Sequence, residues 1–182
     1  MSDTQAVVIT DATPDDCDAI VRIHTASWRF TYRGSLRDEY LDGDIETAKY
    51  DQWSKRLAVP AINQKIFVAR GNNTALGFAC LYTHHNADKG HLLDAIHLDP
   101  SVKRVGIGSA LFKAVVAYAR TIPPAAGLHL YVNKSNSGAH RFYDAQGGVI
   151  IGAFDWHAPD GSVVPRLIYG WQADYLSHAS AR

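Results

Sequence analysis

The sequence is poor in cysteine, in unbalanced charge and in long hydrophobic runs. Its 182 residues include two cysteines, Cys17 and Cys80, without CxxC or Cys/His spacing, so we expect reduced thiols and neither a disulfide framework nor a metal site. The 18 basic and 18 acidic residues cancel, and no run of lysine or arginine suggests a nucleic-acid partner. No apolar run reaches the roughly 20 residues of a membrane span, and the first residues lack a signal-peptide pattern. We therefore expect a soluble, cytoplasmic protein.

Two common nucleotide-binding motifs are also absent. A dinucleotide-binding fold requires GxGxxG in its first βαβ unit, whereas here a Gly-x-Gly lies past the middle of the chain and Leu111 stands at the third glycine position. A P-loop requires Gly-Lys-Ser or Gly-Lys-Thr, and the chain contains neither. The Gly-x-Gly turn is therefore neither part of a dinucleotide-binding fold nor a P-loop.

The composition is that of a folded domain. Hydrophobic residues make up 47% of the chain and charged residues 20%, close to the globular average. A chain of 182 residues fits one domain of ordinary size, and we find no repeat, linker or low-complexity tract. We expect a single domain over residues 1–182.

Periodicity and turn residues predict a mixed α/β order. Thr13-Pro14 begins a helix that runs to about Tyr32, and a weaker helical segment covers residues 37–57. A third, mostly apolar helix starts near Gly106 and ends before Pro123, and a short fourth helix covers residues 136–147. The predicted strands are residues 6–10, 66–69, 75–82, 92–98, 128–132, 149–154 and 166–171. The predicted order is β-α-α-β-β-β-α-β-α-β-β.

The turn before the third helix has the chemistry of a phosphate site. Two glycines let backbone amides approach a ligand closely, and a helix start presents unpaired N–H groups. Lys103 and Arg104 add two full positive charges. By itself such a turn equally fits a tight strand–helix connection. The residues concerned are Lys103, Arg104, Val105, Gly106, Ile107, Gly108 and Ser109.

In its wider context this segment resembles a known family. The stretch IHLDPSVKRVGIGSALFKAVVAYA is similar to the acetyl-CoA signature of GNAT acetyltransferases, Arg/Gln-x-x-Gly-x-Gly/Ala, with Lys103 at the position of the usual Arg or Gln. Asn136 and the run from Phe142 to Gly147 resemble the family's second half, Phe-Tyr-x-x-x-Gly. The N-terminal IHTASWRFTYRG and EYLD resemble one group of bacterial members. The resemblance spans about residues 5–172.

The resemblance implies a fold, a cofactor and roles. It implies a mixed central sheet of about six to seven strands flanked by about four helices, with strands four and five splayed apart to admit acetyl-CoA. The backbone of Ile96, His97 and Leu98 would bind the cofactor arm, and one amide of that strand would face the thioester oxygen. The 103–109 turn would hold the pyrophosphate, and Asn136 would contact the arm. Tyr143 matches the family tyrosine that contacts the cofactor sulfur and protonates it. A phenol, with a pKa near 10, is a suitable proton donor to a thiolate.

The general base is a weaker inference. Asp94 lies on the fourth strand near the place where family members carry an acid or a bound water, and we expect it as the base or a substrate contact. Strict alternation places its side chain on the face of Ile96 and Leu98, so a buried structural carboxylate is the alternative. His97 has the opposite parity, and we expect a structural side chain. The remaining histidines, among them His84, His85, His91 and His129, have no clear metal-ligand spacing.

The acceptor is the least constrained part of the function. Trp28 and Tyr32 lie four residues apart on one helix face and are candidate substrate-binding residues, with core packing as the alternative. A cluster of acidic residues follows, which either forms a solvated helix face or attracts a cationic amine. Its members are Asp38, Glu39, Asp42, Asp44 and Glu46.

We expect direct attack of a primary amine on acetyl-CoA, with a small cationic amine favoured. A peptide or protein amine, or a non-catalytic acyl-CoA-binding module, are the alternatives. The C-terminal hairpin is apolar at Val163, Val164, Ile168, Tyr169 and Trp171, which indicates either a homodimer surface or core.

Overall fold

The β-branched and aromatic segments of the chain form one mixed sheet. A computed structural model describes residues 7–102 and 106–178. Within them the strands are β1 (Val8–Asp11), β2 (Gln64–Gly71), β3 (Thr74–Asn86), β4 (Gly90–Leu98), β5 (Leu128–Asn133), β6 (Val149–His157) and β7 (Val163–Trp171). They are ordered β1-β2-β3-β4-β5-β7-β6. The mixed α/β fold and the seven strands agree with the prediction.

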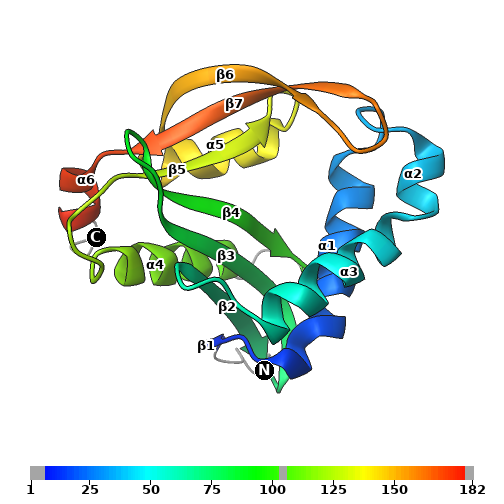
Figure 1. Cartoon of the computed structure of the whole chain (residues 1–182), viewed down its shortest axis with the longest axis horizontal. Coiled ribbons are helices and arrows are strands. Elements are labelled where there is room, and N and C mark those ends of the chain that lie inside the picture. Colours follow the sequence, from blue (N-terminus) through cyan, green and yellow to red (C-terminus); the bar gives the residue numbers. More distant parts are fainter. Residues whose placement is uncertain (1–6, 103–105, 179–182) are drawn as a thin grey trace, which may run out of the picture.

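The helices of the described chain connect and cover these strands (Figure 1). They are the 3-10 helix η1 (Pro14–Asp16), α1 (Cys17–Thr31), α2 (Asp38–Asp42), α3 (Ile45–Ala58), α4 (Ile107–Ala119), α5 (Ser137–Ala145) and α6 (Ala173–His178). The predicted helix over residues 37–57 is two helices, separated near Gly43, and α6 was not predicted.

The pairing of β4 with β5 sets the shape of the sheet. All other neighbouring strands are antiparallel, whereas β4 and β5 run parallel and pair only at His91 with Leu128 and Leu92 with His129. Beyond Leu92 the two strands diverge, and Figure 1 shows them running apart toward the side where α1, α2 and α3 lie. The predicted splay of the fourth and fifth strands is therefore present.

Two hydrophobic layers hold the sheet. On one face α4 packs through Ile107, Leu111 and Val115 against Phe67, Leu81 and Leu93 of the strands. On the other face α1 and α3 pack through Ile20, Ile23 and Trp53 against Val68, Phe78 and Cys80. Figure 1 shows α4 and the α1/α3 pair on opposite sides of β2–β4. The apolar face of each of these helices therefore packs against one face of the sheet.

A β-bulge at Asp94 overturns the predicted side-chain alternation of β4. Cys80 pairs with Ala95, but the next residue of β3, Leu81, pairs with Leu93, so Asp94 has no partner in the ladder. The extra residue turns the Asp94 side chain to the α3 face, where it binds Arg56. Ile96 and Leu98 instead pack with the α4 layer. The expectation that Asp94 shares a face with Ile96 and Leu98 was wrong.

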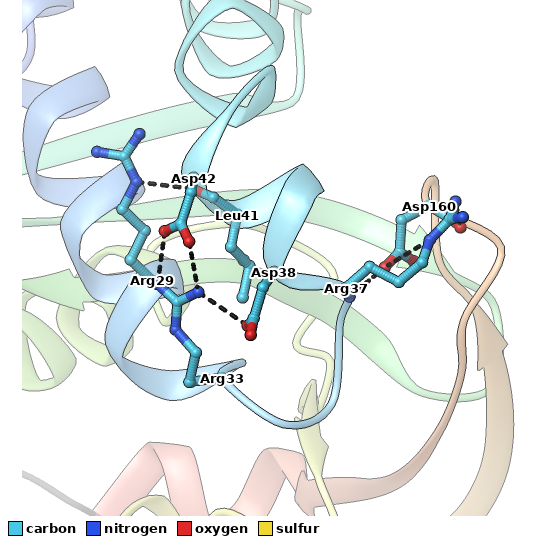
Figure 2. A network of polar contacts seen from close by, with 7 residues as sticks. All are labelled: Arg29, Arg33, Arg37, Asp38, Leu41, Asp42 and Asp160. Atoms are coloured by element: carbon cyan, nitrogen blue, oxygen red, sulfur yellow. Dashed lines mark hydrogen bonds and ion pairs between the residues drawn. The ribbon is translucent and has the colours of Figure 1, made fainter.

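A network of ion pairs fixes α2 between α1 and the β6–β7 turn (Figure 2). Arg33 binds Asp42 through two nitrogens, at 2.7 and 3.0 Å, and Asp38 at 2.9 Å. Arg29 donates its Nε–H to the Leu41 carbonyl at 2.7 Å. The buried carboxylate of Asp160 accepts the Arg37 backbone N–H at 2.6 Å. The acids Asp38 and Asp42 are therefore already paired.

Candidate active site

The first turn of α4 is the part of the predicted phosphate turn that the structure describes. Gly106 is the N-cap residue of α4 and has φ 68°, a left-handed conformation that glycine adopts without strain. A Cβ built there would have no atom of the described residues within 4 Å, apart from the chain neighbours, so this part of the turn is open on the described side. The first intrahelical bond runs from Ala110 N to Gly106 O, which leaves the preceding amides of Ile107, Gly108 and Ser109 without helical acceptors.

Other residues of the predicted phosphate turn have packing roles. The Ile107 side chain is buried in the α4 layer. A Cβ on Gly108 would lie 3.5 Å from the Phe142 ring, an ordinary contact between α4 and α5. The Ser109 hydroxyl accepts a long 3.4 Å hydrogen bond from Gln146. Lys103, Arg104 and Val105 lie outside the described residues. Of the two glycines, only Gly106 has a conformation that requires glycine.

Two asparagines lie where β5 ends beside the opening. Asn136 is the N-cap of α5, and its Oδ1 accepts the Ala139 N–H at 3.0 Å. Asn133, which sequence reasoning missed, is buried, and within the described chain neither its amide oxygen nor its amide nitrogen has a hydrogen-bond partner. Buried amides are rarely left unpaired, so Asn133 marks a place that suits a polar ligand.

Tyr143 lies on α5 with its ring in the core and its hydroxyl free. The ring packs against Phe142, Tyr169 and Trp171. The hydroxyl makes no hydrogen bond to any other described residue. Burial raises the pKa of Tyr143 well above its ordinary value of 10, and the neighbouring Tyr32 and Tyr169 raise it further. The hydroxyl therefore stays protonated at neutral pH.

His97 lies on the α1 face of β4 and is neutral. Its ring stacks on His24 with centroids 4.4 Å apart, and its Nδ1 is 2.9 Å from the Ser27 hydroxyl. Burial lowers the pKa of His97 to about 3, and the charge of Lys49 adds to the effect. Its side chain is thus a packed, uncharged group, while its backbone lies on the diverging part of β4.

Asp94 faces a group of cations rather than an empty cavity. Its Oδ2 accepts the Arg56 Nη1–H at 2.7 Å, and both side chains are partly exposed. The Asp94 charge also acts electrostatically on Lys49 and Arg166, which come from α3 and β7. The predicted acid is therefore the one carboxylate in a basic cluster, and its Oδ1 makes no hydrogen bond with the described residues.

The predicted substrate residues Trp28 and Tyr32 form one wall with Trp156 of β6. Trp28 and Tyr32 stack with centroids 4.6 Å apart, and Trp156 meets them edge-on at 6.0 and 6.1 Å. Arg166 donates from Nη2 to the Tyr32 hydroxyl at 2.9 Å. Tyr32 in turn acts electrostatically on Tyr143. The wall therefore joins the Asp94 cluster to Tyr143.

Lys49 and Arg166 are the site residues that sequence reasoning missed. The Lys49 ammonium lies 3.4 Å from the centre of the Trp28 ring, and the Arg166 guanidinium lies 3.7 Å from the centre of the Trp156 ring. Spacing could have found Lys49, because it falls four residues after Ile45 and four before Trp53 on the buried stripe of α3. Arg166 follows buried Val164 by two residues, which places both on one face of β7.

A cavity of about 410 Å³ opens next to these residues along the chain. Its lining includes Gly34 and Ser35 after α1, Lys134 and Ser135 after β5, and Pro165 of β7. Gly34 closely follows Tyr32, and Pro165 precedes Arg166. Its lining does not include Trp28, Tyr32, Trp156 or Arg166, so the cavity is distinct from the aromatic wall.

A comparison with protein families identifies this architecture. The sequence profile of the Acetyltransferase (GNAT) family matches residues 19–147, which is more than half of the chain. The chain belongs to the GNAT acetyltransferase family. As a member, this GNAT protein is an acetyltransferase with acetyl-CoA as its acetyl donor, and the resemblance seen in the sequence is confirmed.

Solved structures share its fold at low sequence identity. A PaiA N-acetyltransferase from Thermoplasma acidophilum, in complex with coenzyme A, is 19% identical with TM-score 0.69, over 88% of this chain and 98% of that one. A GCN5-related N-acetyltransferase from Rhodopseudomonas palustris is 16% identical with TM-score 0.72, over 92% and 97%. YncA, a putative acetyltransferase from Salmonella typhimurium with acetyl-CoA, is 16% identical with TM-score 0.67, over 97% and 99%. A search of curated protein sequences finds no match.

The GNAT chain carries features that fit acetyl-CoA. Among the described residues, no atom lies near the place of a Cβ on Gly106, the first amides of α4 have no helical acceptor, and the Asn133 amide has no hydrogen-bond partner. In the described residues no group of three or more His, Cys, Asp or Glu side chains is arranged to hold a metal ion. None of the described helices is both long and apolar enough to cross a membrane.

Proposed function

We propose that this GNAT acetyltransferase moves the acetyl group from acetyl-CoA to a primary amine by direct attack of the amine. The observation that supports the proposal is a series of contacts, from Gly108 to Phe142 and from Arg166 to Tyr32, that connects three features. They are the Gly106 turn, the free hydroxyl of Tyr143, and the cluster around Asp94. Cofactor, proton donor and amine would then meet at one place.

Backbone groups hold the cofactor in this proposal. The amides of Ile107, Gly108 and Ser109 bind the pyrophosphate, together with the 103–105 segment. The free edge of Ile96, His97 and Leu98 on β4 binds the arm, and the side chains of Asn133 and Asn136 provide amide hydrogen bonds to it. Acetyl-CoA, when bound, supplies an activated thioester carbonyl. An amide of β4 stabilises the negative charge that develops on the carbonyl oxygen.

Tyr143 stabilises the leaving sulfur in this proposal. Its hydroxyl is protonated throughout the neutral range because its pKa is raised by burial. A thiol of ordinary pKa, about 8.5, is a stronger acid than this phenol, so complete proton transfer from the phenol is uphill. We therefore propose that Tyr143 donates a hydrogen bond to the sulfur as negative charge develops there.

The acceptor amine lies beside Asp94 in this proposal. The Asp94 Oδ1 can accept a hydrogen bond from the amine and take its proton, directly or through water. Trp28 and Tyr32 form the wall of the acceptor pocket. The preference for a small cationic amine loses its support, because Asp38 and Asp42 are paired with Arg33 and the wall carries Lys49 and Arg166. A peptide or protein amine is the alternative acceptor.

Both cysteines are poor nucleophiles, which supports direct attack. Burial raises the pKa of Cys80 to about 12, and the Asp94 charge adds to it. Burial also raises the pKa of Cys17, with a contribution from Asp18. Two free cysteines of this kind also suit the cytoplasmic location that we propose.

Acetyl-CoA binding and turnover test the proposal separately. Acetyl-CoA at about 100 times its dissociation constant should raise Tm by roughly 5–11 °C, whereas NAD should leave it unchanged. Thiol release should then depend on a primary amine, tested with monoamines, spermidine, free amino acids and a short peptide. Intact mass after incubation with acetyl-CoA alone should show no acetylated protein. A stable acetyl-enzyme would contradict direct attack, and binding without any amine-dependent release would contradict the transfer.

A homodimer is also proposed, through the exposed part of the C-terminal hairpin. Within this hairpin Val164, Tyr169 and Trp171 are buried in the core. Its exposed apolar side chains are Val163 of β7 and, on the edge strand β6, Val149, Ile150, Ile151 and Phe154. Sedimentation velocity tests the proposal, and a monomer at all concentrations would contradict it.

A further inference from the structure

The acceptor side of the site holds two basic side chains, Lys49 and Arg166, that form no ion pair with a carboxylate of the described residues. Lys49 is the one lysine or arginine that is buried among the described residues, with 6% of its surface exposed. Arg166 is half-buried, and its Nε is fully covered with no hydrogen-bond partner in the described chain. Neither forms an ion pair with a described carboxylate, whereas Arg56 has Asp94.

Burying unpaired cations is costly, so the arrangement needs a reason. A buried charge without a partner is destabilising, and the cation–π contacts of Lys49 with Trp28 and of Arg166 with Trp156 offset only part of that cost. Burial lowers the pKa of Lys49 to about 7, Asp94 raises it, and Arg56 and Arg166 lower it further. The groups that face Lys49 are Arg56 from α3, Asp94 and His97 from β4, His24 from α1 and Arg166 from β7. Asp94 is the single anion among them.

We propose that the acetyl acceptor carries a carboxylate, and that Lys49 and Arg166 bind this carboxylate. The proposal rests on the function proposed above and names its substrate class. Arg166 has a fixed guanidinium plane, held by Trp156 and the Tyr32 hydroxyl, and its Nη1, which bonds to no described residue, can donate to carboxylate oxygens. Lys49 provides the second charge from the Trp28 side.

The charge balance favours a carboxylate over a phosphate. Asp94 neutralises Arg56, which leaves Arg166 and a partly protonated Lys49. A single negative charge offsets Arg166 and leaves only the partial charge of Lys49, whereas a phosphate dianion would bring a second negative charge toward the Asp94 carboxylate. The same Asp94 can hold the amine of the acceptor. An amino acid has a carboxylate for Lys49 and Arg166, a nearby amine for Asp94, and, where its side chain is apolar, a group that packs against the aromatic wall.

A binding experiment that needs no turnover tests the anion site. Phenylacetate and its uncharged counterpart phenylacetamide are titrated into the protein, with fluorescence of Trp28 and Trp156 as the signal. We expect phenylacetate to bind at least tenfold more tightly than phenylacetamide. The preference should fall to about twofold or less in Arg166→Gln and in Lys49→Met. At pH 8 wild-type binding should take up protons, because the carboxylate favours the charged form of Lys49.

Lys65→Met is the matched control. Lys65 also lies over aromatic rings, 5.8 Å from the centre of Phe67 and 5.1 Å from that of Tyr118, but it pairs with Asp11 away from the site. The carboxylate preference should survive in this variant. Circular dichroism confirms that each variant is folded, and Lys49→Met, which removes a buried charge at similar volume, serves if Arg166→Gln fails to fold.

Turnover of matched amines separates this inference from the proposed function. Each amino acid is compared with its carboxamide, and kcat/KM should be at least tenfold higher for the acid. Selective phenylacetate binding without any amine acetylation would support the anion site and contradict the proposed function. Amine acetylation with no preference for the acid, or equal binding of the two probes, would overturn the inference and leave the proposed function standing.

Discussion

At the scale of single residues, Tyr143 combines a packed ring with a hydroxyl that has no partner. Its ring contacts Tyr169 and Trp171 in the core, while its hydroxyl bonds to no other described residue. The motif around it was visible in the sequence. The sequence did not show that the hydroxyl is unpaired, because a partner can come from any element that packs nearby.

Replacement of Tyr143 by phenylalanine separates catalysis from packing. We expect kcat to fall by about 10²-fold or more, since a positioned proton donor contributes that much. The dissociation constant of acetyl-CoA should change by less than about twofold. The free energy of unfolding should be nearly unchanged because no hydrogen bond within the described chain is lost.

Kinetics of thiol release, calorimetric titration and urea unfolding measure these three quantities. Tyr118→Phe is the control, because Tyr118 of α4 packs against Phe67 of β2, away from the opening between β4 and β5. Equal losses of kcat and of acetyl-CoA affinity in Tyr143→Phe would contradict a role as proton donor.

At the scale of elements, the start of α4 depends on one glycine. Gly106 and Gly34 both have positive φ, 68° and 80°, and both have open space where a Cβ would stand. They differ in place, since Gly106 begins α4 and Gly34 lies in the turn between α1 and α2. The pair therefore separates backbone strain from cofactor binding.

Alanine at each glycine gives matched variants. Both Gly106→Ala and Gly34→Ala should lower the free energy of unfolding by about 1–2 kcal/mol, the cost of a left-handed conformation for a residue with a Cβ. The dissociation constant of acetyl-CoA should rise about tenfold only in Gly106→Ala, because relief of strain moves the first amides of α4. Urea unfolding and calorimetric titration measure the two effects. Equal acetyl-CoA affinity in the two variants would show that the turn is structural alone.

At the scale of the whole molecule, two neutral histidines link stability to pH. His24 and His97 stack between α1 and β4, and burial lowers the pKa of both, for His97 to about 3. The unfolded chain takes up protons on these residues near pH 6.5, before the folded chain does. Their contribution to stability is therefore complete above pH 6.5 and is lost as the pH falls toward 3.

Urea unfolding at several pH values between 7.5 and 4 tests this linkage. Each histidine that stays neutral should add a slope of about 1.4 kcal/mol per pH unit below pH 6. His97→Asn should reduce the slope by that amount, whereas His157→Asn, at an exposed site on β6, should leave it unchanged. An unchanged slope in His97→Asn would mean that His97 is already protonated in the folded protein near pH 6.

The sequence by itself determined the family and the order of the seven strands and the main helices, but not the division between α2 and α3 or the presence of α6. Local signals sufficed for both: Asn72-Asn73 form the β2–β3 turn with positive φ, Gly147 ends α5, and the Gly106 motif begins α4. Such signals act over a few residues, so they can be found along a single chain. The bulge at Asp94 could not be found in this way, because a bulge is defined by how β4 pairs with β3.

Only the tertiary structure decided the charge of the acceptor site. The sequence indicated that acidic residues near α2 could attract a cationic acceptor. In the folded protein, however, Asp38 and Asp42 of this cluster form ion pairs with Arg33. The fold gathers Lys49, Asp94 and Arg166 instead, from α3, β4 and β7, which the sheet order brings together. Electrostatic energy depends on distance and on burial, and residues far apart in sequence acquire both only when the sheet forms.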